Sequence, residues 1–85
     1  MTPEQIERFL EINPQTSKGS SKIFFKSRQT VEGLFIKAPD YAELKKKNFW
    51  RIVAASRVEE YWSSDNVNLS RIFNGSEFTK LSANS

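Results

Sequence analysis

Basic and aromatic side chains alternate through the middle of this chain. Residues 18–57 hold ten of the thirteen Lys and Arg residues but only three of the ten carboxylates, so this segment carries a net charge of +7 and the remainder −4. Such a field attracts polyanions, and aromatic rings beside it can stack on nucleobases. The side chains that we expect to contact nucleic acid are Lys26, Arg28, Lys37, Tyr41, Lys45, Lys46, Lys47, Trp50 and Arg51.

These assignments have structural alternatives. The lysine run 45–47 is also typical of a solvated loop, although lysines can follow a phosphate backbone by charge alone. Tyr41 and Trp50 could instead lie at the edge of the core. Tyr61 and Trp62 follow in an acidic part of the chain, where aromatic side chains favour contact with a protein. The basic segment could equally serve solubility or an acidic protein partner.

The composition argues against catalysis. Cysteine and histidine are both absent, which removes thiolate nucleophiles, imidazole bases and the commonest metal ligands. Glu59 and Glu60 are adjacent and would point to opposite faces of a strand. Asp40 and Glu43 alone would make a loose site for a hard cation. We therefore expect a protein that is not an enzyme and that holds no metal and no cofactor.

The location of the protein is predicted by what the sequence lacks. The first residues are acidic and precede no apolar run, so we expect no secretory signal. No stretch approaches the ~20 apolar residues that a membrane span requires. We expect a soluble, cytoplasmic protein with no membrane contact.

Eighty-five residues make one small domain, which we place at 1–82 with a tail at 83–85. Its first element is a helix at about 3–13. Thr2 can serve as the N-cap, and Gln5 three residues later completes a capping box. Apolar side chains then recur at helical spacing, and this short helix needs to dock by that face to be stable. The side chains of that face are Ile6, Phe9 and Leu10.

After the connector 14–21, the spacing of the apolar residues changes from that of a helix to that of strands, which predicts a sheet that covers about 22–81. Gly33 indicates a bulge or a sharp bend in it. Asn74-Gly75 is a strong turn dipeptide. The strands that we expect are 22–26, 30–37, 49–53, 67–73 and 77–81.

Two segments of this sheet region leave alternatives open. Residues 40–47 could form one helical turn capped by Asp40, or a loop. In residues 54–64, Ala54, Val58, Tyr61 and Trp62 recur at helical spacing, and Ser56 with Glu59 forms a possible capping box. The same stretch could continue a long, bent strand, and we favour the strand because a hairpin loop would then follow.

The order of elements resembles that of the Sm-like small barrels, the family of Sm, Lsm and Hfq proteins. The resemblance covers about 22–82. In the first motif of that family, a strand glycine is followed by apolar, acidic, aromatic and apolar residues. Asp40 stands one place late, and Glu43 stands where Sm proteins usually carry Asn. The residues that follow the order of this motif are Gly33, Phe35, Asp40, Tyr41 and Leu44.

The second motif departs further. It would lie at 72–75 with Phe78 and Leu81, but Phe73 replaces the family's arginine, and the Gly and Asn are exchanged. The Lys-His pair typical of Hfq cannot exist without histidine. The resemblance implies a small barrel that binds RNA, with Tyr41 as the base-stacking residue.

We therefore predict an α+β domain in which an N-terminal helix packs on a strongly bent five-stranded antiparallel sheet, a small Sm-like or SH3-like barrel. Its predicted function is non-enzymatic binding of nucleic acid, RNA before DNA, through residues 18–57. The alternative is a protein-interaction or structural module with no nucleic-acid ligand. Open sheet edges also predict a homo-oligomer at high concentration.

Overall fold

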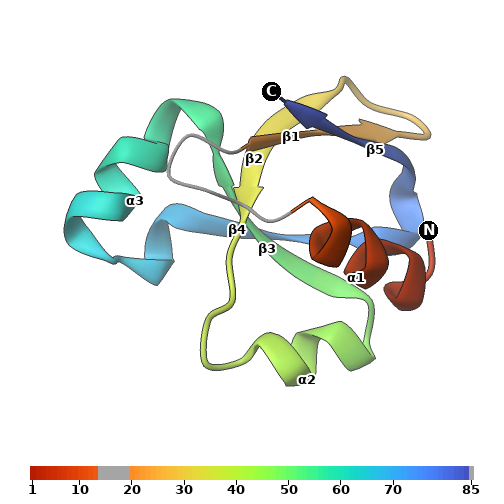
Figure 1. Ribbon diagram of the computed structural model, residues 1–85, viewed down its shortest axis with the longest axis horizontal. Coiled ribbons are helices and arrows are strands. Elements are labelled where there is room, and N and C mark those ends of the chain that lie inside the picture. The colour runs from red at the N-terminus through yellow and green to blue at the C-terminus, as the bar shows by residue number, and fades with distance from the viewer. Residues whose placement is uncertain (14–19, 85) are drawn as a thin grey trace.

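A computed structural model describes residues 1–13 and 20–84 of the chain. Most of the connector predicted at 14–21, and Lys18 within it, lies outside these residues, whereas its last two residues belong to a strand. Figure 1 shows the course of the chain. Its helices and strands are α1 (Pro3–Ile12), β1 (Ser20–Phe25), β2 (Val31–Phe35), α2 (Tyr41–Lys46), β3 (Phe49–Ala54), α3 (Val58–Ser64), β4 (Ser70–Asn74) and β5 (Phe78–Asn84).

The start of α1 confirms the predicted capping box. The Thr2 hydroxyl accepts a hydrogen bond from the Gln5 amide, and the Gln5 side chain accepts one from the Thr2 amide. Two backbone donors that a helix leaves unpaired at its start are thereby satisfied. Ile6 is fully buried, and Phe9 and Leu10 pack beside it, so the predicted apolar face docks on the core.

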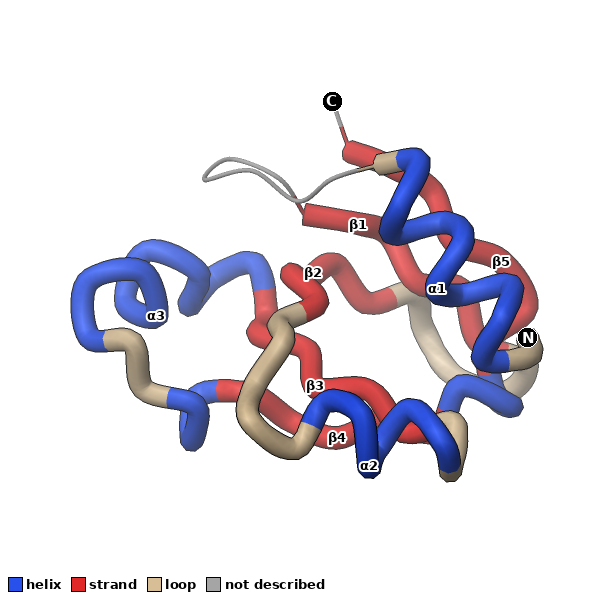
Figure 2. Tube along the Cα trace, turned by 60° about the horizontal axis from the view of Figure 1, so that its bottom comes forward, coloured by secondary structure: helices blue, strands red, loops and turns tan. Residues whose placement is uncertain are grey.

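The five strands form one antiparallel sheet in the order β4-β3-β2-β1-β5. This confirms the α+β class and the five-stranded antiparallel sheet. β4 and β5 are the two edges and do not pair with each other, so the barrel is not closed. Figures 1 and 2 show the chain wrapping round so that α1 lies beside the curled sheet.

The sheet nevertheless curls strongly. In a flat sheet of this order, β1 and β4 would lie roughly 14 Å apart, because neighbouring strands are about 4.8 Å apart. The ring centroids of Phe25 on β1 and Phe73 on β4 are only 5.8 Å apart. The Lys26 amide also donates to the Glu77 carbonyl, which draws the β1–β2 turn toward the start of β5. A register irregularity between Phe24 and Phe25 in the β1–β5 ladder falls at the same place.

Each face of the sheet carries its own core. On the inner face, a cluster that includes Trp50 and Phe78 surrounds Ile6 of α1. On the outer face, Leu34 and Val53 join Val58 of α3 in a smaller cluster. Alternation along the strands explains both, since neighbouring residues point to opposite faces.

Gly33 in β2 and Gly75, directly after β4, allow close packing. A Cβ on Gly33 would lie 2.5 Å from Cγ2 of Ile52, and the register on both sides of Gly33 runs on without a bulge. A Cβ on Gly75 would contact the Asn48 side chain and lie 2.6 Å from Cδ1 of Ile6. Gly75 begins a 3₁₀ helix (Gly75–Glu77) that leads from one sheet edge to the other, with no positive φ.

The strand favoured for 54–64 is wrong. A 3₁₀ turn (Ala55–Arg57) leads into α3, and the predicted capping box is not used, because the N-cap is Arg57 without a side-chain bond. Val58 and Tyr61, one helical turn apart, pack on the outer face of the sheet. A strand would leave that apolar face uncovered, which explains why the helical alternative prevails.

The remaining boundaries differ by a few residues. Of the two alternatives left open for 40–47, the structure has the helix, although the Asp40 side chain forms no cap. The strand predicted at 67–73 begins only at Ser70, after a 3₁₀ turn (Val67–Leu69). β5 extends into the predicted tail. In the part of the chain that the structure describes, no helix is long and apolar enough to cross a membrane.

Candidate functional site

The predicted contact residues fall into three places. Six of them surround α2, two lie in the β1–β2 turn, and Trp50 lies in the inner core. In the view of Figure 1, α2 lies at the bottom of the molecule and the β1–β2 turn at its upper right. The cations therefore do not converge on one face. The six residues around α2 are Lys37, Tyr41, Lys45, Lys46, Lys47 and Arg51.

Tyr41 is the centre of the group around α2. Its half-buried ring packs edge-on against Trp50, with the centroids 6.0 Å apart. The ammonium groups of Lys37 and Lys45 lie 5.5 Å and 5.6 Å from its ring centroid. Burial raises the pKa of the Tyr41 hydroxyl, so it stays neutral and can donate a hydrogen bond. The ring is thus an aromatic platform flanked by two cations.

Lys45 is also tied to the N-terminal helix. Its ammonium donates to the Glu7 carboxylate of α1 at 2.6 Å, and this hydrogen bond raises the pKa of Lys45. Both side chains are about one-third exposed, so the pair is partly screened by solvent. The interaction joins α1 to α2 and neutralises one of the predicted phosphate contacts.

Arg51 has a closer carboxylate partner. Its Nε and Nη2 donate to the two oxygens of Asp40 at 2.8–3.1 Å, and its Nη1 donates to the Ser70 hydroxyl at 3.3 Å. The hydrogen bonds from Arg51 hold the pKa of Asp40 below its usual value. The planar fork of this arginine is therefore already filled. Arg51 fixes the start of α2 against β3 and β4.

Lys46 and Lys47 differ from these two cations. Both are exposed at the end of α2, and within residues 1–13 and 20–84 neither forms an ion pair. Their ammonium groups can bind phosphates without first breaking an ion pair with a carboxylate. With Lys37, they are the cations around α2 that remain available to a polyanion.

Trp50, which was predicted to contact nucleic acid, lies in the inner core instead. Only 2% of this residue is exposed, and its indole donates to the Asn48 side chain at 2.8 Å. Trp50 faces Phe73 across the β3–β4 ladder on the inner side of the sheet. Its neighbour Arg51 points to the outer side, as strand alternation requires.

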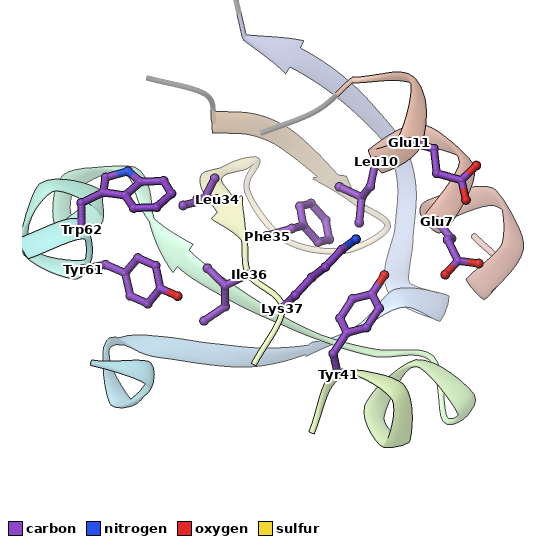
Figure 3. A pocket seen from close by; sticks show the side chains of 10 residues that line it. All are labelled: Glu7, Leu10, Glu11, Leu34, Phe35, Ile36, Lys37, Tyr41, Tyr61 and Trp62. Atoms are coloured by element: carbon purple, nitrogen blue, oxygen red, sulfur yellow. The ribbon is translucent and has the colours of Figure 1, made fainter. Parts of the chain in front are cut away.

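A groove of about 470 Å³ lies beside Tyr41. Its apolar floor comes from β2 and α1, and helices α2 and α3 form its two ends. Figure 3 shows Tyr61 and Trp62 at one end, Tyr41 with Glu7 and Glu11 at the other, and Lys37 crossing between them. The lining residues are Glu7, Leu10, Glu11, Leu34, Phe35, Ile36, Lys37, Tyr41, Tyr61 and Trp62.

Two groove residues come from the segment that the strand prediction misplaced. Tyr61 and Trp62 are on α3, their rings are 5.7 Å apart, and about half of Trp62 is exposed. Their recurrence at helical spacing with Ala54 and Val58 was the signal that could have placed them here. The groove thus combines aromatic faces with Lys37 on one surface.

The second group of predicted cations lies in the β1–β2 turn. Arg28 stacks on Phe25 and Phe73, beside a smaller pocket of about 310 Å³. Lys26 is exposed two residues earlier. This pocket lies at the opening between β1 and β4 of the curled sheet.

Within the described ranges, no group of three or more carboxylates is placed to hold a metal ion. Glu60 forms an exposed ion pair with Arg57 at 3.4 Å. No protein-family model, curated protein or solved structure matches this chain.

Proposed function

We propose that this protein binds single-stranded nucleic acid without catalysis, RNA before DNA, along the surface from α2 to α3. The observation that carries this proposal is the shared groove. Lys37 and Tyr41, both predicted contacts, line it together with the aromatic pair Tyr61 and Trp62. A single strand needs cations for its phosphates and aromatic faces for its bases, and the groove offers both.

The order of elements gives further support. A helix followed by five strands, with the sheet order β4-β3-β2-β1-β5, fits the proposed Sm-like or SH3-like barrel. The Sm resemblance assigns base stacking to Tyr41, and its position between two ammonium groups suits that role. RNA is placed before DNA because of this resemblance.

Salt dependence tests the role of the charges. The logarithm of the association constant for a fluorescent single-stranded RNA should fall linearly with the logarithm of the salt concentration, with a slope of about −0.7 per phosphate contact. Replacing Lys46 and Lys47 by Gln should therefore flatten the slope by about 1.4. The control variant replaces Lys22 and Lys80 by Gln, which removes the same charge from the β1–β5 ladder. An equal change in both variants would indicate only non-specific attraction.

Trp62→Ala tests stacking in the groove. The variant should lose about 1–3 kcal/mol of RNA affinity with no change in the salt slope, because stacking releases no counterions. If RNA and DNA both fail to bind at low salt, nucleic-acid binding is wrong.

Contact with a protein is a second candidate, and a different observation favours it. Glu7 and Glu11 of α1 line the groove opposite the aromatic pair, and phosphates would avoid them. An apolar floor with an exposed Trp beside a polar rim is also typical of protein interfaces. In this case, Trp62→Ala would weaken binding of a protein and leave weak, salt-sensitive RNA binding unaltered.

Self-association belongs to the same proposal. The unpaired edges β4 and β5 could each accept a strand from another copy. Light scattering across a wide concentration range tests it. A monomer mass throughout would contradict it.

A further inference from the structure

Arg28 differs from the other arginines of the basic segment in what it packs on. Its guanidinium carbon lies 5.1 Å from the ring centroid of Phe25 and 5.5 Å from that of Phe73. These rings belong to β1 and β4, which meet here because the sheet curls. The stacked group is held in a defined place although the residue is exposed.

A guanidinium that packs over aromatic faces finds no hydrogen-bond acceptor there, so its N–H donors remain available to an acceptor on another side. In the described part of the chain, no hydrogen bond or ion pair occupies this edge of Arg28. The fork of Arg51, in contrast, is filled by Asp40. Arg28 is therefore a positioned donor set that lacks an acceptor.

The walls of the adjacent pocket supply further donors. Ser27 and Asn74, whose side chains can donate hydrogen bonds, line it with Arg28. The side-chain oxygen Oδ1 of Asn74 already accepts from the Ser76 amide and hydroxyl, so the Asn74 side-chain NH₂ group remains as a donor. Glu77 lines the same pocket and is the one group there that opposes an anion.

We propose that this pocket is a phosphate-binding site, in which Arg28 donates two parallel hydrogen bonds to phosphate oxygens. Arginine favours phosphate because its fork matches the spacing of two oxygens. The phosphate could belong to a nucleic-acid backbone or to a free phosphomonoester. The inference goes beyond the groove and rests on the proposed function only for the nucleic-acid source.

The test measures binding at the pocket by NMR chemical-shift titration. The probes are inorganic phosphate, adenosine 5′-monophosphate, adenosine without phosphate, and a short single-stranded RNA. We expect shifts at Arg28, Ser27 and Asn74 with the three phosphate-bearing probes and none with adenosine. Saturation by RNA alone assigns the site to a backbone phosphate, and saturation by the monophosphate assigns it to a phosphomonoester.

Three variants distinguish the hydrogen-bonding geometry of the Arg28 guanidinium from the effect of its charge alone. Arg28→Lys keeps the charge and loses the fork, so phosphate affinity should fall roughly tenfold, which corresponds to one charge-assisted hydrogen bond. Glu77→Gln should raise the affinity, because it removes the opposing charge. Lys80→Gln is the matched control, since Lys80 also lies over a ring, that of Phe24, and should have no effect.

The expected signs make the proposal easy to overturn. Unchanged affinity in Arg28→Lys, an effect of Lys80→Gln equal to it, or a loss of affinity in Glu77→Gln would each refute a phosphate site. Shifts with adenosine alone would refute it as well. RNA binding that survives at the groove while the Arg28 pocket stays empty would reject this inference alone. Phosphate binding at Arg28 without RNA binding at the groove would reject only the proposed function.

Discussion

The two faces of the sheet are covered to different degrees. On the inner face, α1 seals a core in which Ile6, Trp50 and Phe78 are all 2% exposed or less. On the outer face, α3 covers Val53 and Leu34 but leaves half of Trp62 in solvent, at one end of a groove whose other end lies at α1 and Tyr41. A fully buried side chain has no exposed surface left for a ligand. The comparison assigns stability to the inner core, and it places the proposed recognition in a groove that joins Trp62 of the outer face to Tyr41 beside the inner core.

The largest expected effect is on the inner face. Ile6→Ala should lower the free energy of unfolding by about 2–5 kcal/mol, because it leaves a cavity where α1 meets the core. Chemical denaturation measures this loss. Phe9→Ala on the same helix is the graded control, with about 2 kcal/mol expected because Phe9 is only half-buried. An unchanged midpoint in both variants would mean that α1 does not dock.

A smaller loss is expected where the inner core is tightest. Gly75→Ala adds a methyl group that would lie 2.6 Å from Cδ1 of Ile6 and 2.8 Å from the Trp50 indole nitrogen. Overpacking of this kind costs about 1–3 kcal/mol. The thermal midpoint should fall, and Ile6→Val in the same background should restore part of it. An unchanged thermal midpoint in Gly75→Ala would show that the inner core relaxes around the added methyl group more easily than its burial indicates.

On the outer face, the matching substitution should cost less. Val58→Ala removes two methyl groups from a residue that is 8% exposed, which predicts a loss of about 1–2 kcal/mol in the same denaturation experiment. Val67→Ala, half-buried at the border of this cluster, should cost less still. A loss equal to that of Ile6→Ala would remove the distinction between the two faces.

The sequence predicted the inner face better than the outer one. The capping box at Thr2 and the spacing of Ile6, Phe9 and Leu10 are local signals, and they located α1 to within a residue of its end. The five strands and their antiparallel pairing followed from equally local changes of period. The helix α3 did not follow from local signals. The choice between helix and strand for that segment depends on covering the apolar outer face of the sheet, which is a tertiary contact.

The candidate site shows the same limit. Trp50 was assigned to the surface because cations surround it in sequence, yet strand alternation turns Arg51 outward and Trp50 inward. The partner of Lys45 is Glu7, which lies 38 residues away in the chain, and no local pattern indicates that pair. Counting charges thus located the basic segment but not the carboxylates that neutralise part of it.

The smallest expected effect concerns the ion pair that fixes α2 to the sheet. The hydrogen bonds from Arg51 lower the pKa of Asp40 in the folded protein. Their stabilisation is therefore fully present above the pKa of the unfolded chain and is lost as the pH falls through the lower, folded pKa. Above about pH 5, the thermal midpoint of Asp40→Asn should lie slightly below that of the wild type. The difference should begin to shrink near pH 4 and vanish only below the lowered, folded pKa of Asp40.

Asp65→Asn is the matched control for this last prediction. Asp65 ends α3 in the left-handed conformation, with a φ of 55°, which Asn also adopts readily. It is exposed and forms no ion pair in the described part of the chain, so the substitution removes the same charge without a partner. The thermal midpoint of Asp65→Asn should equal that of the wild type at every pH. If Asp40→Asn follows the wild type as closely, the Arg51 fork does not stabilise the fold, and α2 is held by the packing of Tyr41 on Trp50 instead.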